Sequence, residues 1–415
     1  MTNDGTDAGQ VELRLDGFAH GGAAVGRLPD GRACFVDHGI PGERVRVRID
    51  EQRRRWTRAT VTDVVQPSPD RVPPPCPLFG PDLCGGCALQ HIAPRRQADL
   101  LGGVIADQVE RIGHLDVPGG TVDVLRPHAP DGLGYRNRAR FAVTSDGRLA
   151  FRRARSHELI AVDDCPLLTP SARTLLSGMT SGWQGTAEVQ LQVGSDGRGA
   201  LAVSAQRADV VAPSDLPAVI RQPGRRTRRH GEPQVRHDVA GHAFATGATS
   251  FFQASRPAAE MLVDLVRSWT QPRSDMHIVD CYAGVGLFSA MLAADGATVT
   301  AVEASRQACA DARVNTRDLP VEVVRRDLAR APALRHPVDA VVLDPPRTGA
   351  GPAVMAWIAS LAPSRVAYVS CDPATFARDA RALVDHGFAL ARLTGVDQFT
   401  HTGHVELVAG FERRP

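Results

Sequence analysis

The fold of the C-terminal half of the chain can be read from the segment Val279-Asp280-Cys281-Tyr282-Ala283-Gly284-Val285-Gly286-Leu287-Phe288. A strand-like segment enters it and a helix-like segment leaves it, so Gly284 and Gly286 are expected in a strand-to-helix turn. Glycines let the backbone of such a turn approach a ligand closely. The Gly-x-Gly pattern is common, and by itself it fits a tight structural turn as well as a cofactor loop.

The segments around this turn extend it into a repeating pattern. From about residue 251, strand-like segments alternate with helical ones, and strands are expected at 277–280, 298–302, 321–324, 339–343 and 365–370. This alternation is typical of a doubly wound α/β domain with a mostly parallel, Rossmann-like sheet. The sequence therefore predicts an α/β domain over residues 246–415.

Acidic residues follow successive strands of this expected sheet. Glu303 ends the second strand, where a carboxylate can accept both hydroxyls of a ribose. Asp327 follows the third strand, where an acid could meet an adenine amine, and Asp344 follows the fourth. Open α/β sheets bind ligands at the carboxyl ends of their strands. No second glycine-rich phosphate loop appears, and acids would repel a pyrophosphate, so the pattern favours S-adenosylmethionine over a dinucleotide.

Two further residues are expected at the same edge. Cys371 follows the strand at 365–370 and precedes a helix from about residue 374. A thiol at a helix start gains thiolate character from the helix dipole, which indicates a nucleophile rather than a small buried side chain. Glu406 begins the final strand. His401 and His404 have no further ligand beside them, and we interpret both as structural.

A nucleophilic thiol, a carboxylate base and a methyl donor together indicate one reaction. Uracil C5 is a poor nucleophile, but attack of Cys371 on C6 would make an enolate with electron density at C5. C5 would then take the methyl group. Glu406 would remove the C5 proton, and elimination would free Cys371.

The N-terminal half has a different pattern. Alternating short strands with glycine and proline turns predict a small antiparallel barrel over residues 11–67. A proline-rich linker, an amphipathic helix near 93–113 and a strand-rich region over 135–245 follow. Residues 1–10 are expected to form a disordered tail. The chain has no apolar run long enough to span a membrane and no signal-peptide pattern, so we expect a cytoplasmic protein.

Charge limits how this chain can bind nucleic acid. All 48 basic residues are arginine, and against 46 acids they leave a net charge of +2. A nucleic-acid surface must therefore be a local patch. Arginines gather at 53–55, at alternating positions 136, 138 and 140, and over 221–237. Each run alone also fits a solvated loop, but planar guanidinium groups suit phosphates and bases, so we hypothesise an RNA path along them.

Three cysteines cluster after the linker. Cys76, Cys84 and Cys87 have the spacing Cys-x7-Cys-x2-Cys, and Cys165 offers a fourth thiol. Four thiolates suit a 4Fe-4S cluster and a zinc ion alike, and the spacing alone does not separate the two. Cys34, Cys281 and Cys309 are interpreted as ordinary buried or semi-buried thiols.

Six motifs stand together in the chain: Cys84-Gly-Gly-Cys87-Ala-Leu-Gln-His91, Tyr135-Arg-Asn-Arg138, Ser250-Phe-Phe-Gln253, Asp344-Pro-Pro-Arg347, Ser370-Cys-Asp-Pro373 and His401-Thr-Gly-His-Val-Glu406. In this combination the chain resembles the RNA 5-methyluridine methyltransferases that carry a TRAM domain and an iron–sulfur cluster. The resemblance extends from about Val11 to the C-terminus.

The resemblance implies a division of the chain and a role for each motif. Residues 11–67 would be an OB-like, RNA-binding TRAM barrel, and 246–415 the methyltransferase domain. Residues 68–92 and 120–245 would form a β-rich central domain, with the helix at 93–119 packing on the catalytic domain. Cys371 would be the nucleophile and Glu406 the base. The implied cofactor and cluster ligands are Gln253, Tyr282, Glu303 and Asp344 for S-adenosylmethionine, and Cys76, Cys84, Cys87 and Cys165 for a 4Fe-4S cluster.

The chain departs from the family pattern in four places. Asp372 and Ser255 stand where the family usually has Asn, Ala283 replaces a common Cys, and the first two cluster cysteines are spaced further apart than usual. We expect these changes to affect the fine geometry of the substrate site and to leave the chemistry intact.

Three other functions agree less well with these residues. An RNA 5-methylcytosine enzyme would place a Pro-Cys pair after the fourth strand, where this chain has Asp344-Pro-Pro-Arg347. An exocyclic-amine methyltransferase needs no Cys371, and a non-catalytic RNA-binding or chaperone protein needs neither Cys371 nor Glu406. The expected substrate is 23S rRNA, because barrel and cluster together resemble the ribosomal enzymes of the family, with tRNA as the alternative. No obligate protein partner is indicated.

Overall fold

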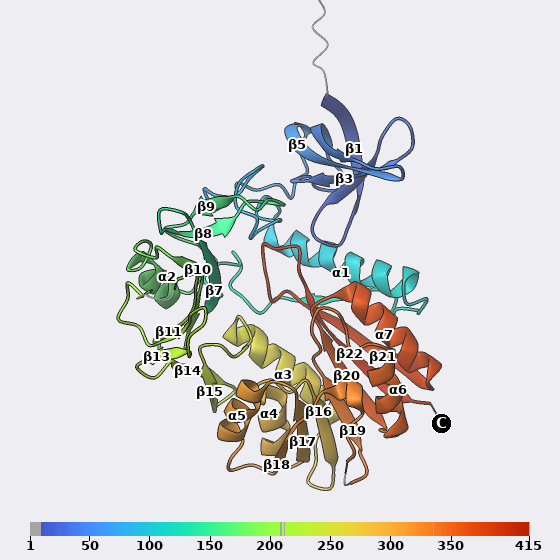
Figure 1. Cartoon of the computed structure of the whole chain (residues 1–415). Coiled ribbons are helices and arrows are strands. Elements are labelled where there is room, and N and C mark those ends of the chain that lie inside the picture. Colours follow the sequence, from blue (N-terminus) through green and yellow to red (C-terminus); the bar gives the residue numbers. More distant parts are fainter. Residues whose placement is uncertain (1–9, 208–209, 211, 335, 415) are drawn as a thin grey trace, which may run out of the picture.

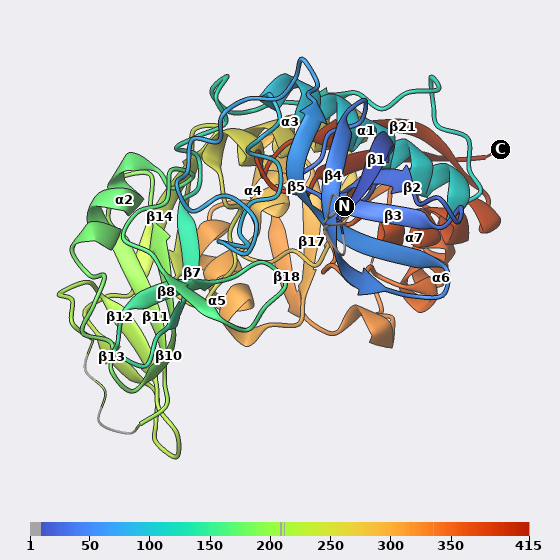
Figure 2. The ribbon, with the colours of Figure 1, turned by 90° about the horizontal axis from the view of Figure 1, so that it is seen from above.

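The computed structural model describes residues 10–207, 210, 212–334 and 336–414. A barrel lies at the top of Figure 1, a central β-rich region at the left, and a large α/β domain below and to the right. Seen from above, the barrel lies over the α/β domain and the central region lies to one side (Figure 2). No helix in the described ranges is long and apolar enough to cross a membrane.

The barrel is closed by five strands in the order β1-β2-β3-β5-β4. The alternation that predicted it is visible in β4, where Val45 and Val47 point into the core while Arg44, Arg46 and Arg48 face outward. Most of the expected tail, residues 1–9, lies outside the described residues, and Gln10 already pairs with Arg48. The strands are β1 (Gln10–Phe18), β2 (Ala24–Arg27), β3 (Ala33–Asp37), β4 (Arg44–Gln52) and β5 (Trp56–Gln66).

Helix α1 (Pro94–Arg111) connects the N-terminal segments to the α/β domain. Leu101, Ile105 and Val109 recur at helical spacing, and all three are buried in the core of that domain. The following strand β6 (Val124–Leu125) pairs with β21 at the edge of the large sheet. The sequence predicted that the central domain resumes at residue 120, but β6 belongs to the sheet of the α/β domain. Its signal was missed because two residues are too few to show a period.

The central region is built on a seven-stranded sheet with the order β13-β12-β11-β10-β7-β8-β9. Helix α2 (Pro170–Ser177) packs on it around the fully buried Trp183. A separate hairpin then leads into the α/β domain. The strands are β7 (Arg138–Val143), β8 (Leu149–Arg152), β9 (Leu159–Ala161), β10 (Thr186–Val193), β11 (Gly199–Ala205), β12 (Ala218–Arg221) and β13 (Arg228–His230), with the hairpin β14 (Gln234–Val239) and β15 (His242–Gly247).

The α/β domain has an eight-stranded sheet in the order β18-β17-β16-β19-β20-β22-β21-β6. The five strands predicted from the sequence are all present and parallel, and β22 runs antiparallel between β20 and β21. The strands are β16 (His277–Cys281), β17 (Thr298–Glu303), β18 (Val321–Arg325), β19 (Ala340–Leu343), β20 (Arg365–Ser370), β21 (Phe388–Val396) and β22 (Glu406–Arg413). The helices are α3 (Arg256–Thr270), α4 (Leu287–Ala294), α5 (Arg306–Asn315), η1 (Leu328–Arg330), α6 (Pro352–Ser360) and α7 (Pro373–Asp385).

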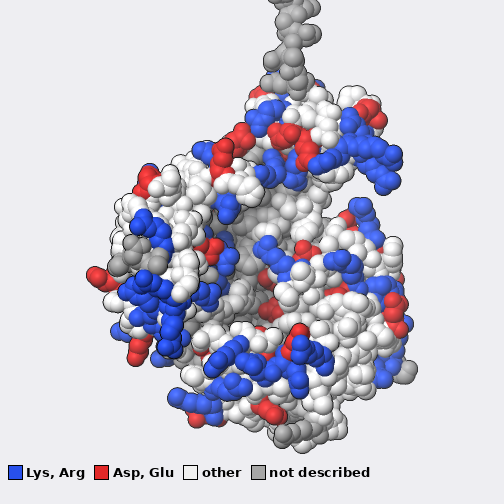
Figure 3. Space-filling view, viewed as in Figure 1, with Lys and Arg blue, Asp and Glu red and all other residues white. Residues whose placement is uncertain are grey.

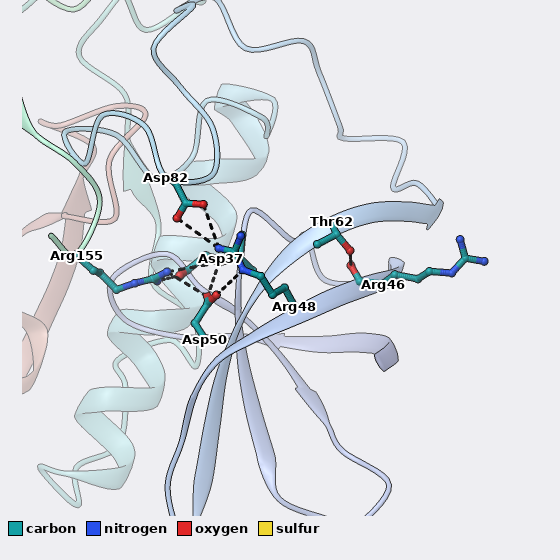
Figure 4. Close-up of polar contacts among 8 residues, drawn as sticks. Asp37, Arg46, Arg48, Asp50, Thr62, Asp82 and Arg155 are labelled. Carbon is teal, nitrogen blue, oxygen red and sulfur yellow. Dashed lines mark hydrogen bonds and ion pairs between the residues drawn. The ribbon is translucent and has the colours of Figure 1, made fainter. Parts of the chain in front are cut away.

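Ion pairs tie the barrel to the central region (Figure 4). Arg155, in the loop after β8, pairs with Asp37 and Asp50 of the barrel. Arg48 of the barrel bonds Asp50 and also reaches Asp82, two residues before Cys84. These contacts fix the barrel against the segment that carries the clustered cysteines.

Candidate active site

Strand register places three of the expected cofactor residues side by side. Cys281 pairs with Val302 on one side and Leu343 on the other. The next residues along the three parallel strands are Tyr282, Glu303 and Asp344, so they form a row at the carboxyl edge of the sheet. This is the edge at which open α/β sheets bind ligands.

The same register brings Cys371 and Glu406 together. In the antiparallel pair β20–β22, Ser370 is opposite Leu407, so the next residues outward are Cys371 and Glu406. Glu406 is only 5% exposed, and its Oε2 has no hydrogen-bond partner in the described residues. The thiol and the carboxylate lie far apart in the sequence yet face each other beside the row of cofactor residues.

The thiol of Cys371 is not activated as its sequence position suggested. Burial, followed by the charges of Glu406 and Asp344, raises its pKa to about 12, and Arg347 opposes this rise. Cys371 does stand immediately before α7, but a helix N-terminus contributes only about half a positive charge. Two nearby carboxylates and partial burial outweigh it, so the expectation of thiolate character from the helix is wrong for the protein without ligand.

The pKa values of three carboxyl groups in this site are raised. Burial, and then the charge of Asp344, raises the pKa of Glu406 well above its ordinary value. Burial and the charge of Asp280 raise the pKa of Asp344 to about 7, while a bond from Gln253 lowers it. Asp280 is also buried, with its pKa raised to about 7 chiefly by burial. A cation entering this site would stabilise all three as carboxylates.

The glycine turn is held against Glu303. The backbone N–H of Gly284 donates to Glu303 Oε2 at 3.0 Å, and that of Ser305 donates to Oε1 at 2.7 Å. Gly286 has a φ of 88°, and a Cβ there would lie 3.3 Å from Thr316. Asp327 is exposed and caps η1 through the N–H of Ala329. It lies near enough to Tyr282 for its charge to raise the pKa of that phenol.

Two polar residues of α5 hold the cofactor segment, and sequence reasoning missed both. Asn315 Nδ2 donates to the carbonyls of Val285 and Ala245, joining the glycine turn to β15. Asp311 accepts from the Gly247 N–H and the Ser250 hydroxyl, which anchors the segment leading to Gln253. Polar residues on an amphipathic helix look like a solvated face, so the sequence carried no signal for these contacts.

Two of the four departures from the family pattern occupy helix N-caps. Ser255 caps α3 by accepting from the Ala258 N–H, and Asp372 caps α7 by accepting from the Thr375 N–H. Ser, Asp and Asn are all strong N-cap residues. Replacing Asn at these positions therefore keeps the local helix start.

The loop that leads to Glu406 is held by segments that lie far from it in the sequence. The backbone N–H groups of Ala88 and Leu89, directly after Cys87, both donate to the carbonyl of His401 at 3.0 Å. His401 also bonds Gln97 of α1, so it holds the loop in place. Gly403 lies against the barrel, where a Cβ would approach the Gly21 carbonyl oxygen to 2.3 Å.

The four clustered cysteines line one cavity of about 210 Å³. The charge of each of the other three thiols adds to the burial that raises the pKa of Cys87 to about 12, so all four are neighbours. Among the described residues, no group of three or more His, Cys, Asp or Glu side chains is close enough to hold a single metal ion. Cys34, Cys281 and Cys309 are each buried.

The surface is hollowed between the barrel, the central region and the α/β domain, with arginines along the rim (Figure 3). Arg225, Arg226, Arg228 and Arg229 are exposed on and beside the edge strand β13. The guanidinium of Arg138 lies 5.2 Å from the ring centroid of Phe251. Phe251 is 60% exposed and stands two residues before Gln253, and sequence reasoning assigned it no role beyond its motif.

Comparison with known families gives two matches in different parts of the chain. Residues 10–62 match the model of the TRAM domain, and residues 324–414 match that of the tRNA (Uracil-5-)-methyltransferases. Among curated proteins, an uncharacterized RNA methyltransferase of Streptomyces coelicolor is 34% identical, covering 97% of this chain and 93% of that protein. The 23S rRNA (uracil(1939)-C(5))-methyltransferase RlmD of Halomonas elongata is also 34% identical, covering 96% of this chain and 88% of that protein.

A solved structure shares the whole fold. The Pyrococcus abyssi tRNA (uracil-54, C5)-methyltransferase, in complex with S-adenosyl-L-homocysteine, superposes with a TM-score of 0.74. The alignment covers 97% of this chain and 100% of that one at 23% identity. The arrangement of barrel, central sheet and α/β domain is therefore common to both chains.

Proposed function

The chain belongs to the family of RNA (uracil-C5-)methyltransferases, and we propose that it converts a uridine of 23S rRNA to 5-methyluridine, with Cys371 as nucleophile and Glu406 as base. The observation that carries the residue roles is the register of β20 and β22, which sets Cys371 opposite Glu406, and the charge of Asp344 acts on both. These three groups are what C5 methylation of uracil requires.

S-Adenosylmethionine fits the row at the sheet edge. Glu303 follows β17, where it can accept the ribose hydroxyls, and the Gly284–Gly286 turn leaves room for close backbone approach. Tyr282, Gln253 and Asp344 would surround the methionine end, and Asp327 would lie toward the adenine. When bound, the cofactor supplies the methyl group and a sulfonium cation.

The reaction follows from the order of the side chains. Cys371 Sγ attacks C6 of a uracil taken out of its stack, and the ring becomes an enolate that is nucleophilic at C5. C5 would take the methyl group from the sulfonium, the S–CH3 bond would break to leave a neutral thioether, and a saturated adduct would stay bonded to Cys371. Glu406 removes the C5 proton, the C6–S bond breaks, and the double bond of 5-methyluracil reforms.

The charges in the site affect the first step, the attack of Cys371 on C6. In the protein without ligand, Cys371 is a thiol at neutral pH, because its pKa is raised to about 12. A sulfonium cation beside Asp344 would offset the carboxylate charges that raise this pKa. The bound cofactor would therefore lower the pKa of Cys371 and favour its thiolate, although the contribution of burial to this pKa would remain.

The four cysteines around the cavity support a 4Fe-4S cluster held by Cys76, Cys84, Cys87 and Cys165. Each thiolate of such a cluster binds a different iron, so its ligands stand further apart than those of one metal ion. A cavity lined by all four thiols fits such a set of ligands. The cluster would act as a structural cross-link between the segment after the barrel and the central sheet.

The choice of 23S rRNA rests on the relatives named for it, and tRNA is the alternative. The arginines along the hollow of Figure 3 support an RNA path between barrel and catalytic domain. Replacing Arg225, Arg226, Arg228 and Arg229 with Ala should weaken RNA binding and reduce its salt dependence. Unchanged affinity and salt slope would exclude this patch from the path.

Labelled S-adenosylmethionine tests the proposal directly. The full chain would be incubated with unmodified 23S rRNA and with unmodified tRNA, and the methylated nucleoside identified after digestion. We expect 5-methyluridine in the rRNA and none with the Cys371→Ala variant. Methylation of tRNA alone would overturn the substrate, and a different nucleoside or activity that survives Cys371→Ala would overturn the residue roles.

A further inference from the structure

A buried glutamine that no motif singled out lies behind Gln253. Gln398 follows β21 and has no exposed surface. Its Nε2 donates to Gln253 Oε1 at 2.9 Å, and Gln253 Nε2 donates to Asp344 Oδ2 at 3.3 Å. The three side chains form a directional hydrogen-bond relay that ends on the Asp344 carboxylate.

The backbone around Gln398 fixes the start of this relay. The N–H of Gln398 donates to the Val396 carbonyl at 2.8 Å, and the N–H of Asp397 donates to that of Leu125 at 2.9 Å. The Gln398 carbonyl lies 3.1 Å from His128 Nε2. These contacts hold the backbone of Gln398. Its side chain makes the bond to Gln253 through Nε2, and its buried Oε1 has no hydrogen-bond partner among the described residues.

The direction of the relay depends on which end of the Gln253 amide faces Asp344. An amide has donors at one end and an acceptor at the other. If Gln253 turned over, its Oε1 would face the Asp344 carboxylate, and two acceptors can share that contact only when Asp344 carries a proton. The donor of Gln398 opposes this turn, because it already engages Gln253 Oε1.

We propose that Gln398 is a positioning residue that locks the amide of Gln253, so that Asp344 meets the cationic cofactor as a carboxylate. This inference rests on the proposed function, in which Asp344 lies beside the sulfonium. Asp280 from β16, Glu406 from β22 and Cys371 after β20 face the same carboxylate, and Arg347 stands on its own loop.

The effect of losing the relay has a definite sign. Gln253 lowers the pKa of Asp344, which burial and Asp280 raise to about 7. Without Gln398 the amide can turn over, and the pKa of Asp344 rises further. A larger share of Asp344 is then protonated at neutral pH, and attraction to the sulfonium is lost at a higher pH than in the wild type.

The test measures S-adenosylmethionine binding by calorimetry between about pH 5.5 and 8.5, on the full chain. In the wild type, affinity should fall as the pH drops through about 7. In Gln398→Leu this fall should move to higher pH, with about tenfold weaker binding at neutral pH, the scale of one bond to a charged group. In a Gln253→Ala background, Gln398→Leu should add no further shift.

Gln97→Leu is the matched control. Gln97 is also fully buried and supports the same loop through His401, but its other bonds go to the carbonyls of Leu89 and Ile92 and not to the relay. It should change the melting temperature and leave the pH dependence of binding in place. If Gln398→Leu does not fold, Gln398→Met replaces it. Met is as long as Gln but has no N–H to donate, so the curve should shift in the same direction.

Three results would overturn the positioning role: a Gln398→Leu curve that matches the wild type, an equal shift in the Gln253→Ala background, or an equal shift in Gln97→Leu. Wild-type affinity that does not vary with pH would overturn it as well. A wild type that binds the cofactor with the expected pH dependence but methylates no RNA would instead overturn the proposed function and leave the relay standing.

Discussion

Cys371 shows how the surroundings of a residue can reverse what its position in the chain suggests. A thiol before a helix is expected to ionise easily, yet Glu406 and Asp344 stand beside it and part of it is buried. Sequence reasoning found all three residues and joined Cys371 and Glu406 in one reaction, but it missed the effect of the two carboxylates on the pKa of the thiol. The sign of their mutual effect depends on strand register, which brings like charges and a thiol together from three strand ends.

The rate at which Cys371 is alkylated should depend on these neighbouring charges. Glu406→Gln removes a charge that raises the pKa of the thiol, so iodoacetamide should modify Cys371 faster in this variant at about pH 8. In the wild type the rate should keep rising above about pH 9, because the thiol pKa is about 12. The rate is read from the Cys371 peptide by mass spectrometry.

Glu412→Gln is the control for this measurement, since Glu412 is exposed at the far end of the same strand. It should leave the alkylation rate at its wild-type value. Equal or slower modification in Glu406→Gln would show that Glu406 does not act on the thiol through its charge.

At the scale of elements, the β/α alternation carried most of the prediction. It located five parallel strands, and because each acid follows a strand, it also placed Glu303 and Asp344 at one edge. The alternation of strands and helices does not show which loops contact one another. Gln253 and Gln398 lie 145 positions apart, and nothing in either segment marks the other as its partner.

The start of α7 gives a test at this scale. Asp372 Oδ1 accepts from the Thr375 N–H at 2.8 Å. Asp372→Ala should lower the free energy of unfolding by about 1 kcal/mol, whereas Asp372→Asn should keep the cap and nearly all of the stability. Urea unfolding of the two variants would decide this. An Asn variant as unstable as the Ala variant would show that Asp372 stabilises the helix through its charge and not as a cap.

At the scale of the whole molecule, three regions meet at the loop before Glu406. The segment after Cys87 bonds His401, and Gly21 of the barrel packs on Gly403. Nearby, Arg155 joins the central region to the barrel, and Arg48 of the barrel bonds Asp82 in the cysteine segment (Figure 4). The loop that leads to Glu406 is therefore held by the barrel and by the segment after Cys87.

Removing the proposed cluster should loosen this junction. Because the cluster would fix Cys87, its loss frees the adjacent N–H groups of Ala88 and Leu89 from the His401 carbonyl. Hydrogen exchange should then become faster at residues 88–89 and in the 400–405 loop, and stay unchanged at 298–303 in the sheet core. If exchange at 88–89 is unaltered after iron removal, the cluster does not hold the loop that leads to Glu406.

The covalent chemistry is tested by following the RNA–protein adduct in variants of the two reacting residues. If Glu406 acts only after methyl transfer, Glu406→Gln should slow turnover by about 10²–10⁴-fold and accumulate a denaturant-resistant adduct with unmodified 23S rRNA. Mass spectrometry should find the methylated uridine bonded to Cys371, and Cys371→Ala should form no adduct. An adduct that persists in Cys371→Ala, or a Glu406→Gln enzyme that turns over at the wild-type rate, would contradict the assignment of nucleophile and base.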